Sequence, residues 1–86
     1  MTKLTGRITD ETGNAVTDAV VEIRNSAGDI VDSVQVNSDG EYTYHLSDGS
    51  WTLNVWDPHG RRGRAEVELI DAEEARSDIT IEPEGA

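Results

Sequence analysis

Apolar and polar residues alternate along most of this chain in short runs. Polar turns separate the runs, and each contains one of five glycines: Gly13, Gly28, Gly40, Gly49 and Gly60. A period of two between such turns is typical of half-buried antiparallel strands. The runs cover residues 3–10, 16–24, 30–36, 41–46, 51–57, 64–70 and 78–82. They predict an all-β antiparallel sandwich of about seven strands.

The inward positions of these runs define a predicted hydrophobic core. It consists of Leu4, Ile8, Val21, Ile23, Val34, Val36, Tyr42, Tyr44, Leu46, Trp51, Leu53, Val55, Val67, Leu69, Ile79 and Ile81. One run conflicts with the pattern, because Asp32 shares the inward face with Ile30, Val34 and Val36. A charge among apolar neighbours predicts an edge strand or a β-bulge near Asp32.

The chain is expected to form one domain, residues 1–86, because it is short and contains no linker or internal repeat. Only residues 71–76 favour a helix, and they are too few for more than one turn. Residues 83–86 are expected to fray as a tail. The absence of cysteine excludes disulfides and zinc sites of the thiolate kind.

The charge balance is strongly acidic. Asp and Glu total 18 against 7 Lys and Arg, for a formal net charge of -11, and Lys3 is the only lysine. We favour an origin in an extreme halophile over an ordinary acidic domain, because the acidity comes with so little lysine. The negative field opposes binding to nucleic acid or anionic membranes. No apolar stretch has the length of a signal peptide or membrane span, so membrane insertion is not expected.

Several segments together resemble a known family. They are residues 4–10 (LTGRITD), 12–16 (TGNAV), 19–21 (AVV), 38–42 (SDGEY) and 46–53 (LSDGSWTL). Over nearly the whole chain this pattern resembles the carboxypeptidase regulatory-like, transthyretin-like β-sandwich family. The resemblance implies a transthyretin-like or immunoglobulin-like sandwich. It also implies a structural or interaction role, because members of the family are mostly non-catalytic accessory modules.

A narrower similarity is to the N-terminal domain of prophage tail fibres. It rests on Gly6, Asp10 and Gly13 and on the late acidic turn at residues 71–74 (DAEE). It implies a virion component of a halophilic host's virus: a capsid decoration, tail or fibre-attachment protein assembled in the host cytoplasm. The partners would be capsid, tail or fibre subunits, or further copies of this chain. The alternative is an accessory or adhesion domain of a larger cell-surface or secreted protein.

The sequence offers little for catalysis. His45 and His59 lack the spacing of metal ligands, and no nucleophile motif or phosphate-binding loop accompanies them. We therefore expect no enzyme activity, no metal and no cofactor. An enzyme of transthyretin-like fold would need a cleft lined by His and Arg at an oligomer interface. Only His45, His59 and the arginines of residues 61–64 are candidates for it.

Two other motifs are better explained by structure than by chemistry. Residues 37–41 (NSDGE) resemble part of a calcium loop, but without the flanking helices a hairpin turn with Gly40 at positive φ is favoured. Lys3 and Asp78 suggest the isopeptide bond of related adhesin sandwiches. Both have outward parity, whereas that bond requires burial, and we reject it.

One surface constellation is a candidate partner-binding site. Trp56 has outward parity on its strand, and three of the six arginines follow in what is expected to be one loop. Trp and Arg are the residues most enriched in interface hot spots. The predicted site is Trp56, His59, Arg61, Arg62 and Arg64. The sequence leaves a second interpretation open, in which Trp56 covers the end of the sandwich and the arginines neutralise neighbouring carboxylates.

The acidity generates a prediction about salt. At a formal net charge of -11, repulsion between carboxylates destabilises the compact state. Salt at about 1 M shortens the Debye length to about 3 Å and screens this repulsion. We expect the melting temperature to rise substantially between low salt and molar KCl, as measured by circular dichroism. A flat or falling curve would remove the halophilic interpretation and leave the fold prediction intact.

Overall fold

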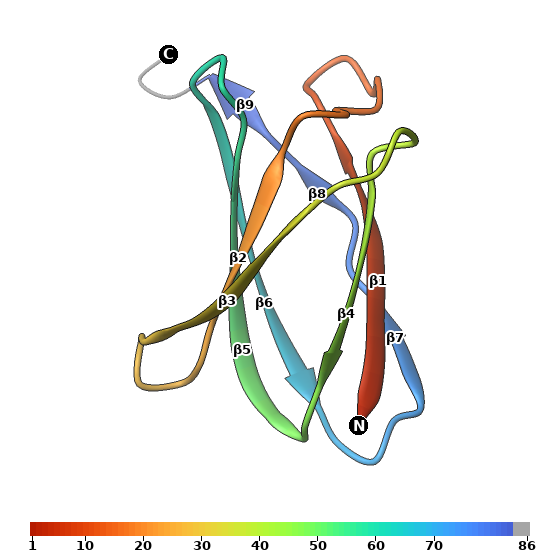
Figure 1. Ribbon diagram of the computed structural model, residues 1–86, viewed down its shortest axis with the longest axis vertical. Coiled ribbons are helices and arrows are strands. Elements are labelled where there is room, and N and C mark those ends of the chain that lie inside the picture. Colours follow the sequence, from red (N-terminus) through yellow and green to blue (C-terminus); the bar gives the residue numbers. More distant parts are fainter. Residues whose placement is uncertain (84–86) are drawn as a thin grey trace.

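Two β-sheets packed face to face form the computed structural model, which describes residues 1–83 (Figure 1). The first sheet has the order β4-β1-β7, with β8 also paired to β1. Its strands are Thr2–Thr9 (β1), Glu41–Leu46 (β4), Glu74–Arg76 (β7) and Ile79–Thr80 (β8). The second sheet has the order β3-β2-β5-β6-β9. Its strands are Val20–Arg24 (β2), Ile30–Gln35 (β3), Gly49–Trp56 (β5), Arg61–Leu69 (β6) and Glu82–Pro83 (β9).

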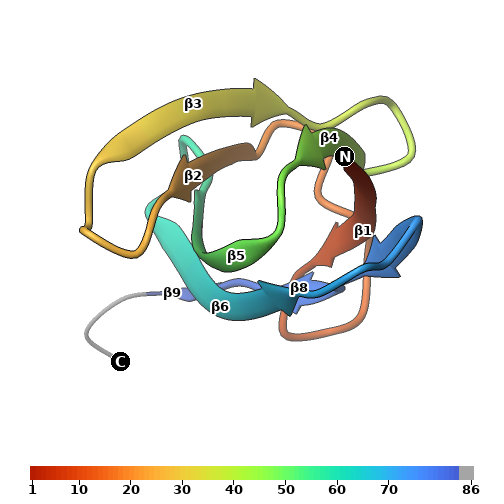
Figure 2. The same cartoon turned by 90° about the horizontal axis from the view of Figure 1, so that it is seen from below.

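The all-β sandwich predicted from the sequence is confirmed. Residues 1–83 contain no helix, and therefore none long and apolar enough to cross a membrane. Seen from below, the sheets curve around a common interior, with β3 beside β4 on one side and β6 beside β8 on the other (Figure 2). The described chain has nine strands rather than about seven, because the last segment is divided into three short ones.

The C-terminal segment differs most from the sequence prediction. Residues 74–76, within the stretch expected to be helix-friendly, form strand β7, which pairs in parallel with β1. The edge of β1 provides backbone partners: the N–H of Lys3 donates to the carbonyl of Glu73, and the N–H of Ser77 donates to that of Thr5. Pro83, expected to begin a frayed tail, pairs with Arg61 in β9. Residues 84–86 of that tail lie outside the described residues.

Glycine lets this segment cross the sandwich. At Gly6 on β1, a Cβ atom would overlap the carbonyl oxygen of Ser77. At Gly63 on β6, a Cβ atom would lie 2.6 Å from the carbonyl oxygen of Thr80. The chain therefore passes from β1 to β6 in contact with backbone at both points. Beside Gly6, the hydroxyl of Tyr42 donates to the Ser77 carbonyl at 2.6 Å, and burial raises the pKa of Tyr42 to about 12.

Every residue of the predicted core lies in the interior or packs against it. Val16, which the prediction left out, is also buried, because residues 15 and 16 fold back onto the end of β1. The inward placement of Ile30 was wrong, since it is 59% exposed. The register of β2 and β3 shifts opposite Ile23 and Arg24, which changes the parity of the start of β3.

The prediction about Asp32 is confirmed on both points. Strand β3 is an edge strand, and its pairing with β2 has the irregularity expected of a bulge. The Asp32 carboxylate is exposed and accepts a hydrogen bond of 2.8 Å from the hydroxyl of Tyr44 on β4, the neighbouring edge of the other sheet. This bond lowers the pKa of the Asp32 carboxyl and joins the rims of the two sheets.

Four of the five glycine turns share one hydrogen-bond pattern. The first residue is Asp or Asn, and its Oδ1 accepts the backbone N–H groups two and four residues later. Glycine follows at the fourth position with φ between 75° and 87°, a region that suits glycine best. The four turns begin at Asp10, Asn25, Asn37 and Asp57. The turn at residues 37–41 has Gly40 at positive φ, as the sequence predicted. It is not a hairpin, because the strands that it links, β3 and β4, belong to different sheets and do not pair.

Burial of Leu53 in the centre of β5 generates a stability prediction. Its side chain is completely buried, so Leu53→Ala leaves a cavity as well as losing transfer free energy. We expect the free energy of unfolding to fall by roughly 2–5 kcal/mol, most of the stability of so small a domain. Denaturant titration measures it. The control Thr43→Ala, at an exposed position on β4, should change it by less than about 0.5 kcal/mol. A near-neutral Leu53→Ala would contradict the packing described above.

Candidate docking site

The arginines expected in one loop lie on a strand. Only Asp57, Pro58, His59 and Gly60 form the turn between β5 and β6, and Arg61 is the first residue of β6. Side chains on a strand alternate between its two faces, and Arg61 therefore points the other way from Arg62 and Arg64. The five predicted site residues are consequently divided between the end of the sandwich and its outer face.

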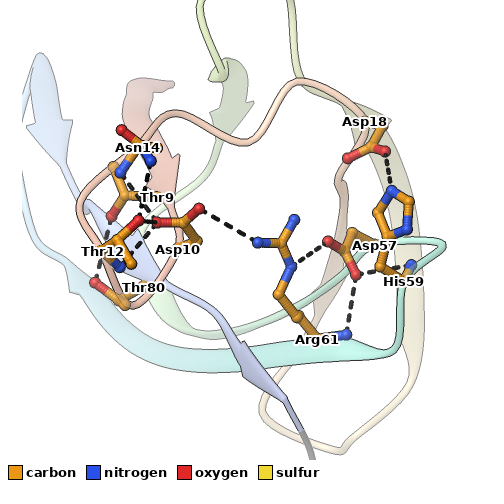
Figure 3. Close-up of polar contacts among 9 residues, drawn as sticks. All are labelled: Thr9, Asp10, Thr12, Asn14, Asp18, Asp57, His59, Arg61 and Thr80. Atoms are coloured by element: carbon orange, nitrogen blue, oxygen red, sulfur yellow. Dashed lines mark hydrogen bonds and ion pairs between the residues drawn. The ribbon is translucent and has the colours of Figure 1, made fainter.

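Arg61 bridges two loops at the end of the sandwich. Its Nε donates to Oδ2 of Asp57 at 2.6 Å, and its Nη1 lies 3.3 Å from Oδ2 of Asp10 (Figure 3). The Asp57 side chain is completely buried and that of Arg61 is 21% exposed. Asp10 and Asp57 are the first residues of two of the four similar turns. A single arginine thus joins the β1–β2 connection to the β5–β6 turn.

The buried Asp57 carboxylate is held in its charged form. Burial acts to raise its pKa, but hydrogen bonds from the backbone N–H and guanidinium of Arg61, and from the N–H of His59, outweigh it. The net effect lowers the pKa of Asp57 below its usual range. Arg61 therefore has the internal neutralising role that the sequence left open as the second interpretation.

His59 lies at the tip of the same turn. Its Nε2 is 3.3 Å from Oδ2 of Asp18, in the connection between β1 and β2 (Figure 3). Both side chains are largely exposed, so this contact is accessible to solvent. It is a second link between the two loops that Arg61 joins.

The outer face of the second sheet brings Trp56 together with Arg62 and Arg64. Trp56 on β5 pairs directly with Arg62 on β6, and Asn54 pairs with Arg64. On the other side of β5, Asn54 pairs with Glu22 of β2. An open pocket of about 590 Å³ lies over these strands. We call this surface the Trp56 face and define it by the outward residues Glu22, Arg24, Asn54, Trp56, Arg62 and Arg64.

Polar groups on the Trp56 face also interact with one another. Arg24 pairs with Glu22 on its own strand, and Arg64 pairs with Glu66 at 2.9 Å. Glu22, Arg24 and Asn54 were not among the predicted site residues. The sequence pattern indicates that these residues point outward. It does not give the strand order β2-β5-β6, which places them beside Trp56.

The arrangement gives no support for a catalytic centre. His59 lies in the β5–β6 turn, whereas His45 lies on β4 opposite Lys3, on the other sheet. Residues 1–83 contain no group of three or more His, Cys, Asp or Glu side chains that could hold a metal ion. Lys3 and Asp78 lie apart on exposed positions, and the Asp78 carboxylate accepts the backbone N–H of Arg7.

Comparison with solved structures defines the class of fold. The 5-hydroxyisourate hydrolase of Klebsiella pneumoniae superposes with a TM-score of 0.73 at 18% identity, covering 96% of this chain and 86% of the hydrolase. Chlorocatechol 1,2-dioxygenase of Pseudomonas putida gives 0.70 at 12% identity, with coverage of 93% and 59%. The shaft pilin SpaA of Lactobacillus rhamnosus GG gives 0.67 at 16% identity, with coverage of 99% and 48%. At these identities the likeness establishes the transthyretin-like sandwich alone.

Sequence comparison then places the chain in its family. The model of the carboxypeptidase regulatory-like domain matches residues 3–82. Two Mycobacterium tuberculosis proteins, named Uncharacterized protein Rv0814c and Uncharacterized protein Rv3118, are each 31% identical over 80 residues. The matches cover 93% of this chain and 79% of each relative. The chain therefore belongs to the carboxypeptidase regulatory-like domain family, as its sequence motifs indicated.

The Asp57–Arg61 pair generates a prediction about acid stability. Asp57→Asn keeps a turn-forming side chain, as Asn25 and Asn37 show at the same turn position, but loses the charge that Arg61 pairs with. We expect the free energy of unfolding at pH 7 to fall by about 1–3 kcal/mol, the range for a buried hydrogen bond to a charged group. Denaturant titration across pH measures it.

The pH dependence has a definite sign. Because the pKa of Asp57 is lowered on folding, its stabilisation is complete above the usual value of 3.8 and is lost as the pH falls through the lowered value. The difference between wild type and Asp57→Asn should therefore disappear in strong acid. Asp39→Asn, which removes the same charge from an exposed position, is the matched control and should change the free energy of unfolding by less than about 0.5 kcal/mol across this pH range. A difference that stays constant down to pH 2 would contradict the assignment.

Proposed function

We propose that this chain is a docking module that binds a partner protein through the Trp56 face. The observation that carries the proposal is the pairing of a half-buried tryptophan with two outward arginines over an open pocket. Trp56 supplies apolar area that a partner can cover, and Arg62 and Arg64 supply planar donors for carboxylates. This combination is typical of the few residues that dominate binding energy at an interface.

The charge of the rest of the molecule favours an acidic partner at this face. At a net charge of -11, most of the surface repels a carboxylate-rich protein. The Trp56 face has three arginines against Glu22 and the adjoining Glu66, which leaves it positive by one charge, and so it attracts such a partner in one orientation. Electrostatic complementarity of this kind selects orientation and accelerates association more than it increases affinity.

The biological setting that we propose is a virus particle of a halophilic host, in which the domain is a decoration, tail or fibre-attachment protein. The resemblance of Gly6, Asp10, Gly13 and the acidic turn at residues 71–74 to the N-terminal domain of prophage tail fibres supports it, and so does the non-catalytic character of the family. The fold likeness to a pilin named as a shaft subunit also fits a structural role. An accessory domain of a larger cell-surface protein is the second candidate, and the same pilin likeness fits it.

The experiment begins with density-gradient fractionation of the source culture, probed with an antibody against the domain. In the virion setting the domain migrates with particles that contain nucleic acid, and in the second setting it stays with cell envelopes. The purified fraction is then tested for binding of labelled domain. We expect Trp56→Ala with Arg62→Ser to weaken binding at least about tenfold, because each residue is a typical hot spot.

The variant leaves Arg61 unchanged because Arg61 holds the buried Asp57 carboxylate and its loss would confuse binding with folding. Arg7→Ser is the matched control: it removes one exposed arginine from the outer face of β1, on the opposite sheet. It should bind like wild type. Retention of full binding by a folded Trp56/Arg62 variant would show that the docking surface lies elsewhere.

A further inference from the structure

Strand β6 has an edge that the rest of the described chain leaves largely unpaired. On one side β6 pairs with β5 along its whole length from Arg62 to Leu69. On the other side β9 pairs only with Arg61 and Arg62. From Gly63 onward, no strand within residues 1–83 pairs with this second edge. An exposed edge of this kind is a template for a strand from another chain.

The register shows which backbone groups face this edge. The N–H of Asp57 donates to the carbonyl of Arg61, so Arg61 and every second residue after it turn their backbone groups toward β5. Arg64, Glu66 and Glu68 therefore turn their N–H and C=O groups toward the open edge. A partner strand placed there would find donors and acceptors spaced for an antiparallel ladder.

The apolar side chains next to this edge are incompletely covered. Ala65 and Val67 point toward the interior, yet both remain partly exposed while Leu53 and Val55 on the neighbouring strand are buried. They lie at the open side of the sandwich, with β7 and its half-buried Ala75 on the opposite sheet. A strand added beside β6 would cover them.

The outward side chains of β6 indicate which strand would pair with this open edge. They read Arg62, Arg64, Glu66 and Glu68, two positive charges followed by two negative ones. This order is complementary to itself when reversed. We infer that two copies of this chain associate by antiparallel pairing of their β6 strands about a two-fold axis at Ala65. Arg64 of each copy then lies opposite Glu66 of the other, and both turn their backbone groups to the shared edge.

Other registers are disfavoured by the same side chains. Centring the pair on Glu66 places that carboxylate opposite its own copy, and centring it on Arg64 does the same for two guanidinium groups. A shift by an odd number of residues would bring outward residues of one copy beside inward residues of the other. Strand β9 occupies the edge at Arg62, which limits the new ladder to the residues around Ala65.

The opposite edge of the same sheet is protected against such pairing. On β3 the Asp32 carboxylate accepts the backbone N–H of Ser33 at 2.7 Å, and the register with β2 is irregular. Bulges and side chains that occupy edge groups are common defences of edge strands. From Gly63 to Leu69, β6 has neither feature in the register with β5.

The salt concentration determines whether this association between copies can be measured. Two copies each carrying a net charge of -11 repel one another over the whole surface. Salt removes this long-range repulsion first, whereas charges in direct contact are screened less. At about 0.5 M KCl the Debye length lies between about 8 and about 3 Å, which suits the measurement.

The test is sedimentation velocity of the whole chain in about 0.5 M KCl over a range of concentrations. Wild type is expected to form a dimer. Arg64→Glu places four carboxylates at the new contacts and Glu66→Arg places four arginines there, so each variant alone should dimerise at least about tenfold more weakly. An equimolar mixture of the two variants restores opposite charges at every contact. It should recover to within about threefold of wild type.

The mixture separates the contact between copies from the internal pair of Arg64 and Glu66, which stays broken in both variants. Arg24→Glu and Glu22→Arg are matched controls, since they change the same charges and break the equivalent ion pair on β2. Both should dimerise like wild type. The inference is overturned if wild type is monomeric throughout, if the single variants dimerise normally, or if their mixture is no stronger than either alone. Docking at the Trp56 face is tested separately, with the Trp56→Ala and Arg62→Ser variant, which leaves Arg64 and Glu66 unchanged.

Discussion

The close crossing of residues 74–83 is the constraint on which the rest of the structure depends. This segment pairs first with β1 of one sheet and then with β6 of the other, so it holds the two layers together. The crossing is possible only because β1 and β6 carry glycine where the backbone comes nearest, at Gly6 and Gly63. In a chain without disulfides this continuous backbone link replaces a covalent staple. A side chain at either position would push the segment outward and open the core beneath it.

The β5–β6 hairpin is the second organising element, because its turn determines to which face each arginine points. The Asp57 turn fixes the register of β6, and strand alternation then sends Arg61 to the end of the sandwich and Arg62 and Arg64 to its outer face. One consequence is structural, since Arg61 neutralises a buried carboxylate and ties two loops. The other concerns the proposed docking site, since Arg62 and Arg64 meet Trp56 on an accessible surface.

Together these features describe a small module with its chemistry on its surfaces. The interior is filled by strand side chains, and the accessible features are a face around Trp56 and the open edge of β6. The two are adjacent, because Arg62 borders the face and the edge begins after it. Pairing of two copies through β6 would therefore place two Trp56 faces on one continuous sheet, and a partner with repeated sites would bind both at once.

The sequence by itself determined the fold class, the family and the membership of the core. Period-two alternation and glycine turns are local signals, and residues from Leu4 to Ile81 followed them because each strand has one buried face. Even the conflict at Asp32 was readable as an edge strand. Residues 74–76 were an exception, because pairing with a distant strand outweighed their local preference for helix. They form a strand because β1 has an unpaired edge beside them.

The candidate site was decided by the tertiary structure. The sequence placed Trp56 correctly on the outward face of its strand but expected the arginines after it in a loop. It had no means of knowing that Glu22 and Asn54 lie beside them, because strand order depends on contacts between distant residues. The roles of Asp10 and Arg61 were hidden for the same reason, since 51 positions separate the two charges that pair. The alternation of apolar and polar residues is a local property that the sequence shows directly, whereas a surface is formed by strands that come together only when the chain folds.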